Sequence, residues 1–174
     1  MPVLAAPPTR PPALELTPDD LLRLPDGEHC ELVDGHLVEK EMGFLTSEVT
    51  AEVQFRIRAV VREGKLGWAP AQECGYQCFP DDPGKVRKPD ASFIAYARLP
   101  LEAAHEGWVR IPPDLAVEVV SPNDPFEDVQ RKVREYLGAG VALIWVVSPA
   151  GGTVMVYRQD GRHSLLGESD TLTG

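Results

Sequence analysis

Two stretches of the chain carry apolar residues at helical spacing. Between residues 46 and 64 the apolar positions are 49, 53, 57, 60 and 61, which predicts a helix capped by Thr46 or Ser47 and ended by Gly64. A second helix is predicted after Pro125, with an apolar stripe at positions 126, 129, 133 and 137 and a glycine stop at position 138 or 140. Each predicted helix therefore has one face suited to a core.

Runs of apolar and β-branched residues predict the strands. Two runs cover residues 68–79 and 86–96 and are separated by the turn-rich segment Asp81-Asp82-Pro83-Gly84. The run 114–120 precedes the second helix, and the runs 141–147 and 154–157 follow it. This alternation predicts an α/β fold with a central mixed sheet of four to five strands flanked by helices.

Turn and capping signals indicate where the ordered chain begins. Prolines at positions 2, 7, 8, 11 and 12 predict a flexible lead-in over residues 1–15. Thr17 followed by Pro18 predicts the start of a short helix, and Asp34-Gly35 predicts a tight hairpin between two short strands. We expect one domain over residues 16–174. A truncated C-terminus stays open, because the last residues form no terminating element.

Composition narrows the class of protein and its partners. The 174 residues are 43 % hydrophobic and 25 % charged, as in ordinary globular domains. The longest weakly polar run, residues 138–147, is too short to span a membrane. The net charge of −10 argues against indiscriminate attraction to phosphates, so nucleic-acid binding would need local basic patches and bound cations. Three cysteines cannot all pair with one another, which favours small buried thiols in a cytoplasmic protein.

Two carboxylates stand where strand residues would normally be apolar. Asp90 precedes the run Ala91-Ser92-Phe93-Ile94, and Glu118 interrupts the run 115–120. A charge inside a strand is costly unless it is paired or coordinates a metal. Mg²⁺ commonly takes one or two carboxylates together with water. The alternative from the residues alone is that both side chains lie at strand ends in water.

Four blocks of sequence, in the same order, are similar to the Uma-two family. They are residues 31–39, Pro89-Asp90, Glu118-Val119-Val120-Ser121-Pro122, and residues 132–147. The resemblance spans roughly residues 15 to 160. Members of this family are restriction-endonuclease-like proteins of the PD-(D/E)XK nuclease superfamily. The resemblance therefore implies a restriction-endonuclease-like fold and an Mg-dependent endonuclease that hydrolyses DNA phosphodiester bonds.

The resemblance also implies roles for individual side chains. Asp90 and Glu118 would hold Mg²⁺ or Mn²⁺, which polarises a phosphate and activates a bound water. Lys132 would position that water or neutralise charge on the phosphate oxygens. Glu31, from the first hairpin, is a candidate additional acidic ligand, with a solvated edge-strand carboxylate as the alternative. Gln130 is a further polar candidate beside them.

Some positions depart from the family pattern. In the superfamily motif a lysine lies two residues after the glutamate, and this chain has Val120 at that position. The resemblance therefore assigns the role of that lysine to Lys132. Family members often carry a histidine where this chain has Thr46-Ser47-Glu48. Basic residues at positions 85, 87, 88, 131, 132 and 134 could guide a phosphate backbone, or simply balance neighbouring carboxylates.

Two other functions stay open at this point. A catalytically inactive nuclease-fold module for nucleic-acid or protein interaction would account for Val120 and for the acidic charge. A hydrolase of another class would use the two carboxylates as acid and base. DNA is the expected partner, and exposed sheet edges together with the apolar run 141–147 allow a homodimer.

Overall fold

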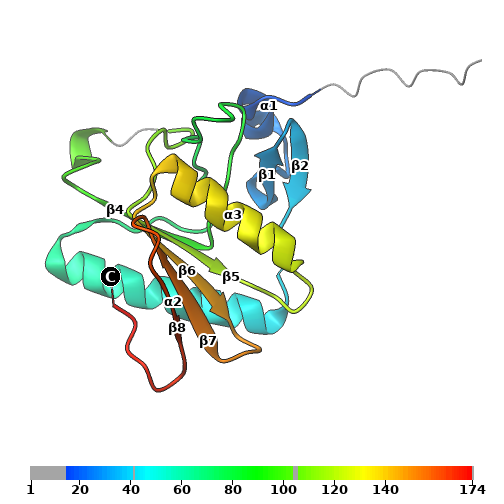
Figure 1. Cartoon of the computed structure of the whole chain (residues 1–174). Coiled ribbons are helices and arrows are strands. Elements are labelled where there is room, and N and C mark those ends of the chain that lie inside the picture. Colours follow the sequence, from blue (N-terminus) through cyan, green and yellow to red (C-terminus); the bar gives the residue numbers. More distant parts are fainter. Residues whose placement is uncertain (1–14, 41, 104–105, 174) are drawn as a thin grey trace, which may run out of the picture.

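A six-stranded sheet organises the computed structural model, which describes residues 15–40, 42–103 and 106–173 (Figure 1). Its strands follow one another in chain order: β3 (Gly67–Trp68), β4 (Ala91–Ala95), β5 (Leu115–Val119), β6 (Leu143–Ser148), β7 (Thr153–Arg158) and β8 (His163–Leu166). Among these strands β5 and β6 run parallel, and the other neighbours are antiparallel. The predicted mixed α/β class is confirmed, with six strands instead of four or five.

One helix connects the two parallel strands. α3 (Phe126–Ala139) leads from β5 to β6, as a parallel pair requires a crossover, and Gly140 ends it at φ +94°. Val133 and Tyr136 pack with Ile144 in the core on this face of the sheet. Phe126, which was expected in the apolar stripe, is 71 % exposed, because it lies in the first turn beyond the edge of the sheet core.

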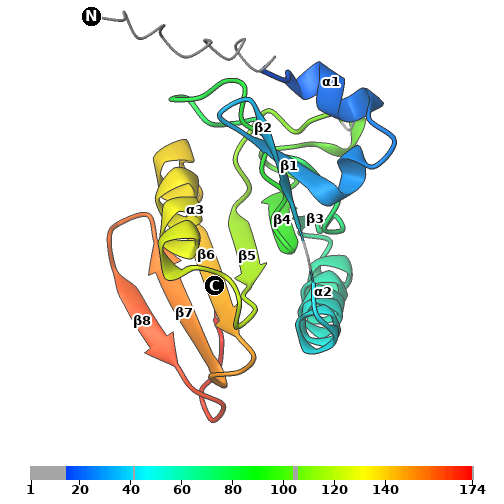
Figure 2. The ribbon, with the colours of Figure 1, turned by 90° about the vertical axis from the view of Figure 1, so that its right-hand side faces the viewer.

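A second helix covers the opposite face of the sheet (Figure 2). α2 (Phe44–Gly64) packs Val53 and Ile57 against a cluster that contains Val117. The helix begins at Gly43, without a side-chain cap, and ends at Lys65 in the left-handed conformation, φ +49°. The predicted caps at positions 46, 47 and 64 are therefore wrong, since all three lie inside the helix.

Alternation along β5 decides which side chains face α3. Leu115, Val117 and Val119 belong to the core under α2, whereas Ala116 belongs to the core under α3. Successive side chains of a strand point to opposite faces. Glu118 therefore points to the same side as Ala116, toward α3.

A small unit of N-terminal elements packs at one end of the sheet (Figure 1). α1 (Pro18–Arg23) begins with a capping box between Thr17 and Asp20, followed by a 3₁₀ turn (Gly27–His29). β1 (Cys30–Val33) and β2 (His36–Glu39) form the predicted hairpin. Leu32 and Val86 exchange two backbone hydrogen bonds of 2.9 and 2.8 Å, which join the hairpin to the segment before β4.

The stretch from residue 69 to residue 90 is mostly irregular, although strands were predicted over most of it. Its backbone pairs at isolated points, such as Tyr76 with Arg87. Prolines at 70, 80, 83 and 89 explain this, because proline removes a ladder donor. A 3₁₀ turn (Leu101–Ala103) follows β4. The predicted lead-in lies outside the described residues, except for residue 15.

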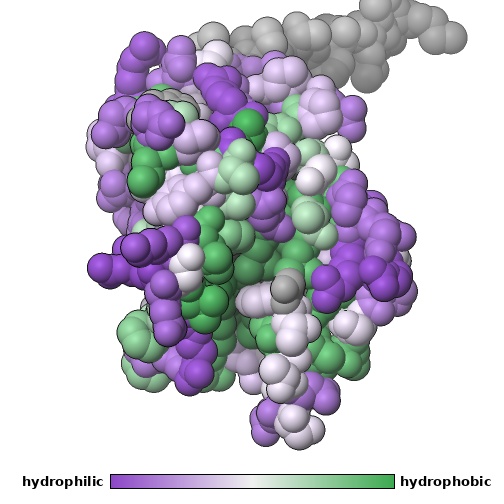
Figure 3. Space-filling model, turned by 90° about the vertical axis from the view of Figure 1, so that its left-hand side faces the viewer, coloured by the Kyte–Doolittle hydropathy of each residue, from purple (hydrophilic) through white to green (hydrophobic). Residues whose placement is uncertain are grey.

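The surface seen from the left side of Figure 1 carries hydrophobic residues between hydrophilic borders (Figure 3). The apolar run 141–147, expected to favour association, does not supply an edge, because β6 lies between β5 and β7. Among the described residues, no helix combines the length and the apolar character that crossing a membrane requires.

Candidate active site

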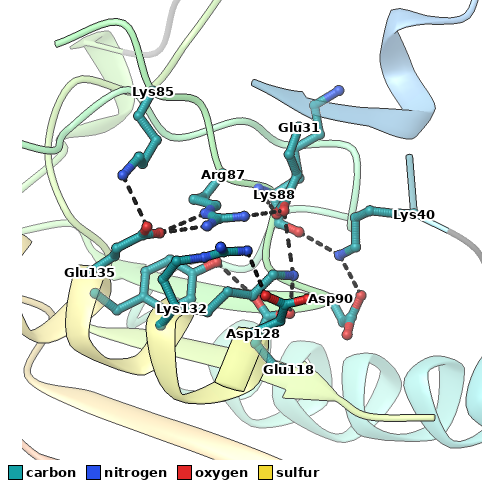
Figure 4. A network of polar contacts seen from close by, with 12 residues as sticks. Glu31, Lys40, Lys85, Arg87, Lys88, Asp90, Glu118, Asp128, Lys132 and Glu135 are labelled. Atoms are coloured by element: carbon teal, nitrogen blue, oxygen red, sulfur yellow. Dashed lines mark hydrogen bonds and ion pairs between the residues drawn. The ribbon is translucent and has the colours of Figure 1, made fainter. Parts of the chain in front are cut away.

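The four residues that the sequence singled out meet around one cavity (Figure 4). This cavity has a volume of about 230 Å³, and Glu31, Asp90, Glu118 and Lys132 all line it, together with Lys40. Asp90 immediately precedes β4, Glu118 lies on β5, Lys132 on α3, and Glu31 on β1. The fold thus brings together side chains from four separate segments, and their catalytic roles stay predictions.

Glu118 is buried and accepts hydrogen bonds from two residues of α3. Its Oε2 accepts a hydrogen bond of 2.9 Å from Lys132 Nζ, and its Oε1 accepts one of 2.7 Å from the Tyr136 hydroxyl. Lys132 and Tyr136 are one helical turn apart and so share a face. Burial raises the pKa of Glu118, and attraction to Lys132 and Lys40 offsets this only in part. Burial and the charge of Glu118 also raise the pKa of Tyr136, which therefore stays a hydrogen-bond donor.

Asp90 is attached to the neighbouring strand through both its backbone and its side chain. Its N–H donates to the carbonyl of Val117 at 2.9 Å, and its Oδ2 accepts the N–H of Val119 at 2.7 Å. The two bonds are made to the residues directly before and after Glu118. They therefore hold the carboxylates of Asp90 and Glu118 on adjacent segments. The other oxygen, Oδ1, accepts a 2.7 Å hydrogen bond from Lys40 Nζ (Figure 4).

Glu31 is completely buried, so the solvated edge-strand alternative is wrong. Its Oε2 pairs with Arg87 at 2.8 Å and lies 3.4 Å from Lys132 Nζ, while its Oε1 accepts the N–H of Lys88 at 2.9 Å. Burial raises the pKa of Glu31, but Lys132, Arg87 and Lys40 outweigh it and lower the pKa to about 2. Glu31 is therefore ionised at neutral pH and orients two cations.

Three of the basic residues, which could have guided phosphate or balanced carboxylates on a solvated surface, are buried and paired. Lys85, Arg87 and Lys88 are 8 %, 1 % and 2 % exposed. Lys85 and Arg87 both bind Glu135, at 2.9 and 2.7 Å, and Lys88 Nζ donates to the carbonyls of residues 27 and 28. These side chains join segments of the protein, because buried cations need partners. The exposed basic positions of this set are 131 and 134, on α3.

Lys40 is the site residue that the sequence analysis missed. It follows β2 directly, and its Nζ donates to Asp90 Oδ1 at 2.7 Å and to the Lys88 carbonyl at 2.6 Å. Burial lowers the pKa of Lys40, but attraction to Glu118 and Asp90 outweighs it and raises the pKa. No local motif marks this residue, since a lysine after an exposed hairpin strand is normally solvated. Tyr136 could have been found, because it stands one turn after Lys132.

The structure also shows where the remaining residues named in the sequence analysis lie. Gln130 Nε2 donates to the Tyr157 hydroxyl at 3.0 Å, toward β7 and not into the cavity. Thr46 and Val120, at the two departures from the family pattern, both line the cavity. The three cysteines are free and half-buried, and burial raises the pKa of Cys78 to about 12.

Comparisons with known proteins identify the family and the fold. A family model named Uma2 and described as "Putative restriction endonuclease" matches residues 18–174. The chain belongs to the Uma2 family. A crystal structure described as that of a "putative nuclease" from Anabaena variabilis is similar with a TM-score of 0.76 and 25 % identity, over 91 % of this chain and 88 % of that one. No curated protein matches the chain. The predicted family and nuclease-like fold are confirmed.

The oxygen atoms of this Uma2 site suit a hard divalent ion. Within the described ranges no three His, Cys, Asp or Glu side chains form a metal-binding group. A metal would therefore rely on Asp90 and Glu118 with water, which is a usual ligand set for Mg²⁺. The Lys40 ammonium, held by Asp90 Oδ1 and a carbonyl oxygen, acts as a stand-in cation at this place. The residues fit Mg²⁺ or Mn²⁺.

Proposed function

We propose that this Uma2 protein is a divalent-metal-dependent endonuclease that hydrolyses phosphodiester bonds of DNA. The observation that carries the proposal is the shared cavity of Asp90, Glu118 and Lys132, in which Glu118 pairs with Lys132 and Asp90 lies on the adjacent segment. Membership of a family described as restriction endonucleases supports a nuclease, as does the similarity to the nuclease from Anabaena variabilis.

Asp90 and Glu118 would hold Mg²⁺ or Mn²⁺ in this proposal. An ion held there would polarise a phosphate group and lower the pKa of a bound water. Lys132 contributes a fixed positive charge that can neutralise charge developing on the phosphate oxygens. Its Nζ lies 2.9 Å from Glu118 and 3.4 Å from Glu31, so both carboxylates orient it. Glu31 acts as a positioning residue, because Arg87 and Lys132 surround it.

The test is cleavage of supercoiled and linear DNA by the full chain with Mn²⁺ or Mg²⁺. We expect Asp90→Asn and Glu118→Gln to abolish cleavage while circular dichroism shows a folded protein. Asp160→Asn is the matched control, because Asp160 is an exposed residue of the β7–β8 turn that pairs with Arg162. Absence of cleavage of every DNA form by the native protein would contradict the proposal.

A second candidate function is a nuclease-fold module that binds nucleic acid or protein without turnover. One observation favours it: Lys40 and Lys132 pair with Asp90 and Glu118 at 2.7 and 2.9 Å, so cations of the protein itself neutralise both carboxylates. Such a module should bind its partner equally well with and without Mn²⁺. DNA binding that strengthens with Mn²⁺ and weakens in Asp90→Asn would favour the nuclease.

The proposal extends to location and assembly. We propose a cytoplasmic location, because the three thiols are free. We also propose a homodimer formed through β8, the strand at one edge of the sheet, because an edge strand offers unpaired backbone groups. Light scattering on the eluted protein measures the assembly, and a monomeric mass at micromolar concentration would exclude this dimer.

A further inference from the structure

A lysine side chain fills the place between the carboxylates of the cavity. Lys40 Nζ lies 2.7 Å from Asp90 Oδ1 and 2.6 Å from the Lys88 carbonyl oxygen, and its side chain is 19 % exposed (Figure 4). Glu118 and Glu31 also attract this ammonium group. Lys40 is thus held by oxygen atoms and negative charge from three separate segments.

The oxygen that Lys40 occupies is the one that the metal would need. Asp90 Oδ2 already accepts the N–H of Val119, whereas Oδ1 binds Lys40. A carboxylate oxygen beside a carbonyl oxygen is a pair of hard ligands of the kind that Mg²⁺ and Ca²⁺ prefer. A divalent ion and an ammonium group at this place would repel each other strongly, because both lie in a poorly solvated cavity.

We propose that Lys40 is an internal competitor of the divalent ion, so that metal binding requires its ammonium group to leave Asp90. This inference rests on the metal site of the proposed function and adds a residue that sets its affinity. The backbone of Lys40 stays attached, because its N–H donates to the His29 carbonyl at 3.0 Å. Rotation of the four-carbon side chain is therefore sufficient to free the oxygen, and the occupied fraction of the site depends on this competition.

If Lys40 competes with the metal, removing its ammonium group should raise the metal affinity and lower the stability of the metal-free protein. Removing the ammonium group should tighten metal binding by at least about tenfold, because one opposing charge disappears from the site. The same change should lower the melting temperature of the metal-free protein by a few degrees, because Asp90 loses its partner. A lysine that merely supports the fold would lower both stability and metal affinity when removed.

The test is calorimetric titration of the full chain with MnCl₂, together with thermal melting in the presence of a chelator. The variants are Lys40→Met and Lys40→Gln, and the Gln amide keeps a neutral donor should the Met variant fail to fold. Lys65→Met is the matched control, because Lys65 is exposed at the end of α2.

Tighter Mn²⁺ binding in the Lys40 variants, with a lower metal-free melting temperature and an unchanged Lys65→Met variant, supports the inference. Equal affinity in native protein and Lys40 variants overturns it and leaves the proposed metal site intact. An absence of binding in all of them, including the native protein, overturns both the inference and the metal-dependent function.

Discussion

Replacing Glu31 by glutamine tests whether the buried ion cluster stabilises the fold. Glu31 is completely buried and pairs with Arg87, which is 1 % exposed. The variant keeps the shape of the side chain and removes its charge, so Arg87 retains Glu135 at 2.7 Å as its remaining anionic partner. Breaking a buried ion pair typically costs about 3–5 kcal/mol, because one charge loses its compensation.

The lowered pKa of Glu31 indicates a loss of stability near the lower end of the range of about 3–5 kcal/mol. The fold lowers this pKa from 4.5 to about 2, and each pKa unit corresponds to about 1.4 kcal/mol. The charged carboxylate therefore contributes about 3 kcal/mol at pH 7. The contribution is complete above the unfolded pKa of 4.5 and is lost as the pH falls toward 2. We expect it to be about 2 kcal/mol at pH 3.5.

Urea denaturation of native protein and Glu31→Gln over a range of pH measures this contribution. With a slope of about 2 kcal/mol per molar urea, the midpoint should fall by about 1.5 M at pH 7, and the difference should narrow below pH 4.5. Glu52→Gln is the control, because Glu52 pairs with Arg56 on the surface and its loss should cost less than about 0.5 kcal/mol. A difference below about 1 kcal/mol at pH 7, or one that stays constant down to pH 3.5, would refute the argument.

Three further predictions concern the same cavity. Lys132→Met should slow DNA cleavage by about a hundredfold or more while metal affinity changes less, because the ammonium group acts on the phosphate; single-turnover kinetics with saturating Mn²⁺ measures this. Tyr136→Phe should lower the free energy of unfolding by about 1–3 kcal/mol, because Glu118 Oε1 loses its buried donor; urea denaturation measures it. Addition of MnCl₂ should raise the melting temperature and a chelator should reverse the rise, because a ligand that binds only the folded state stabilises it; calorimetry that shows no rise would contradict this.

Elements with local signals were predictable from the sequence. The capping box at Thr17, the turn at Asp34-Gly35 and the end of α3 at Gly140 depend on residues next to one another in the chain. β8 was not predicted, because its residues are mostly exposed and lack a clear alternation. The irregular stretch from residue 69 to residue 90 was also misjudged, since its pairing partners, such as Val109 for Tyr76, lie far away in the chain.

The residues of the site also differ in whether the sequence could reveal them. Asp90 and Glu118 stood out because each interrupts an apolar run, and a charge in such a place needs a partner. Lys40 carried no such signal, because its contact with Asp90 exists only after the hairpin docks through Leu32 and Val86. Its neighbours along β2 are exposed, so the pattern indicated solvent for Lys40 as well.

The charges at the centre of the cavity are paired at short range. Glu31, Asp90 and Glu118 contact Arg87, Lys40 and Lys132, respectively, although the lining as a whole holds six carboxylates and four cations and so keeps the acidic sign of the chain. Because buried pairs are screened much less than exposed charges, these contacts dominate the electrostatics beside each carboxylate. The attraction of this site for a metal or a phosphate therefore depends on which internal cation can leave its partner. Lys40 and Lys132 are the partly exposed ones, at 19 % each, whereas Arg87 is enclosed.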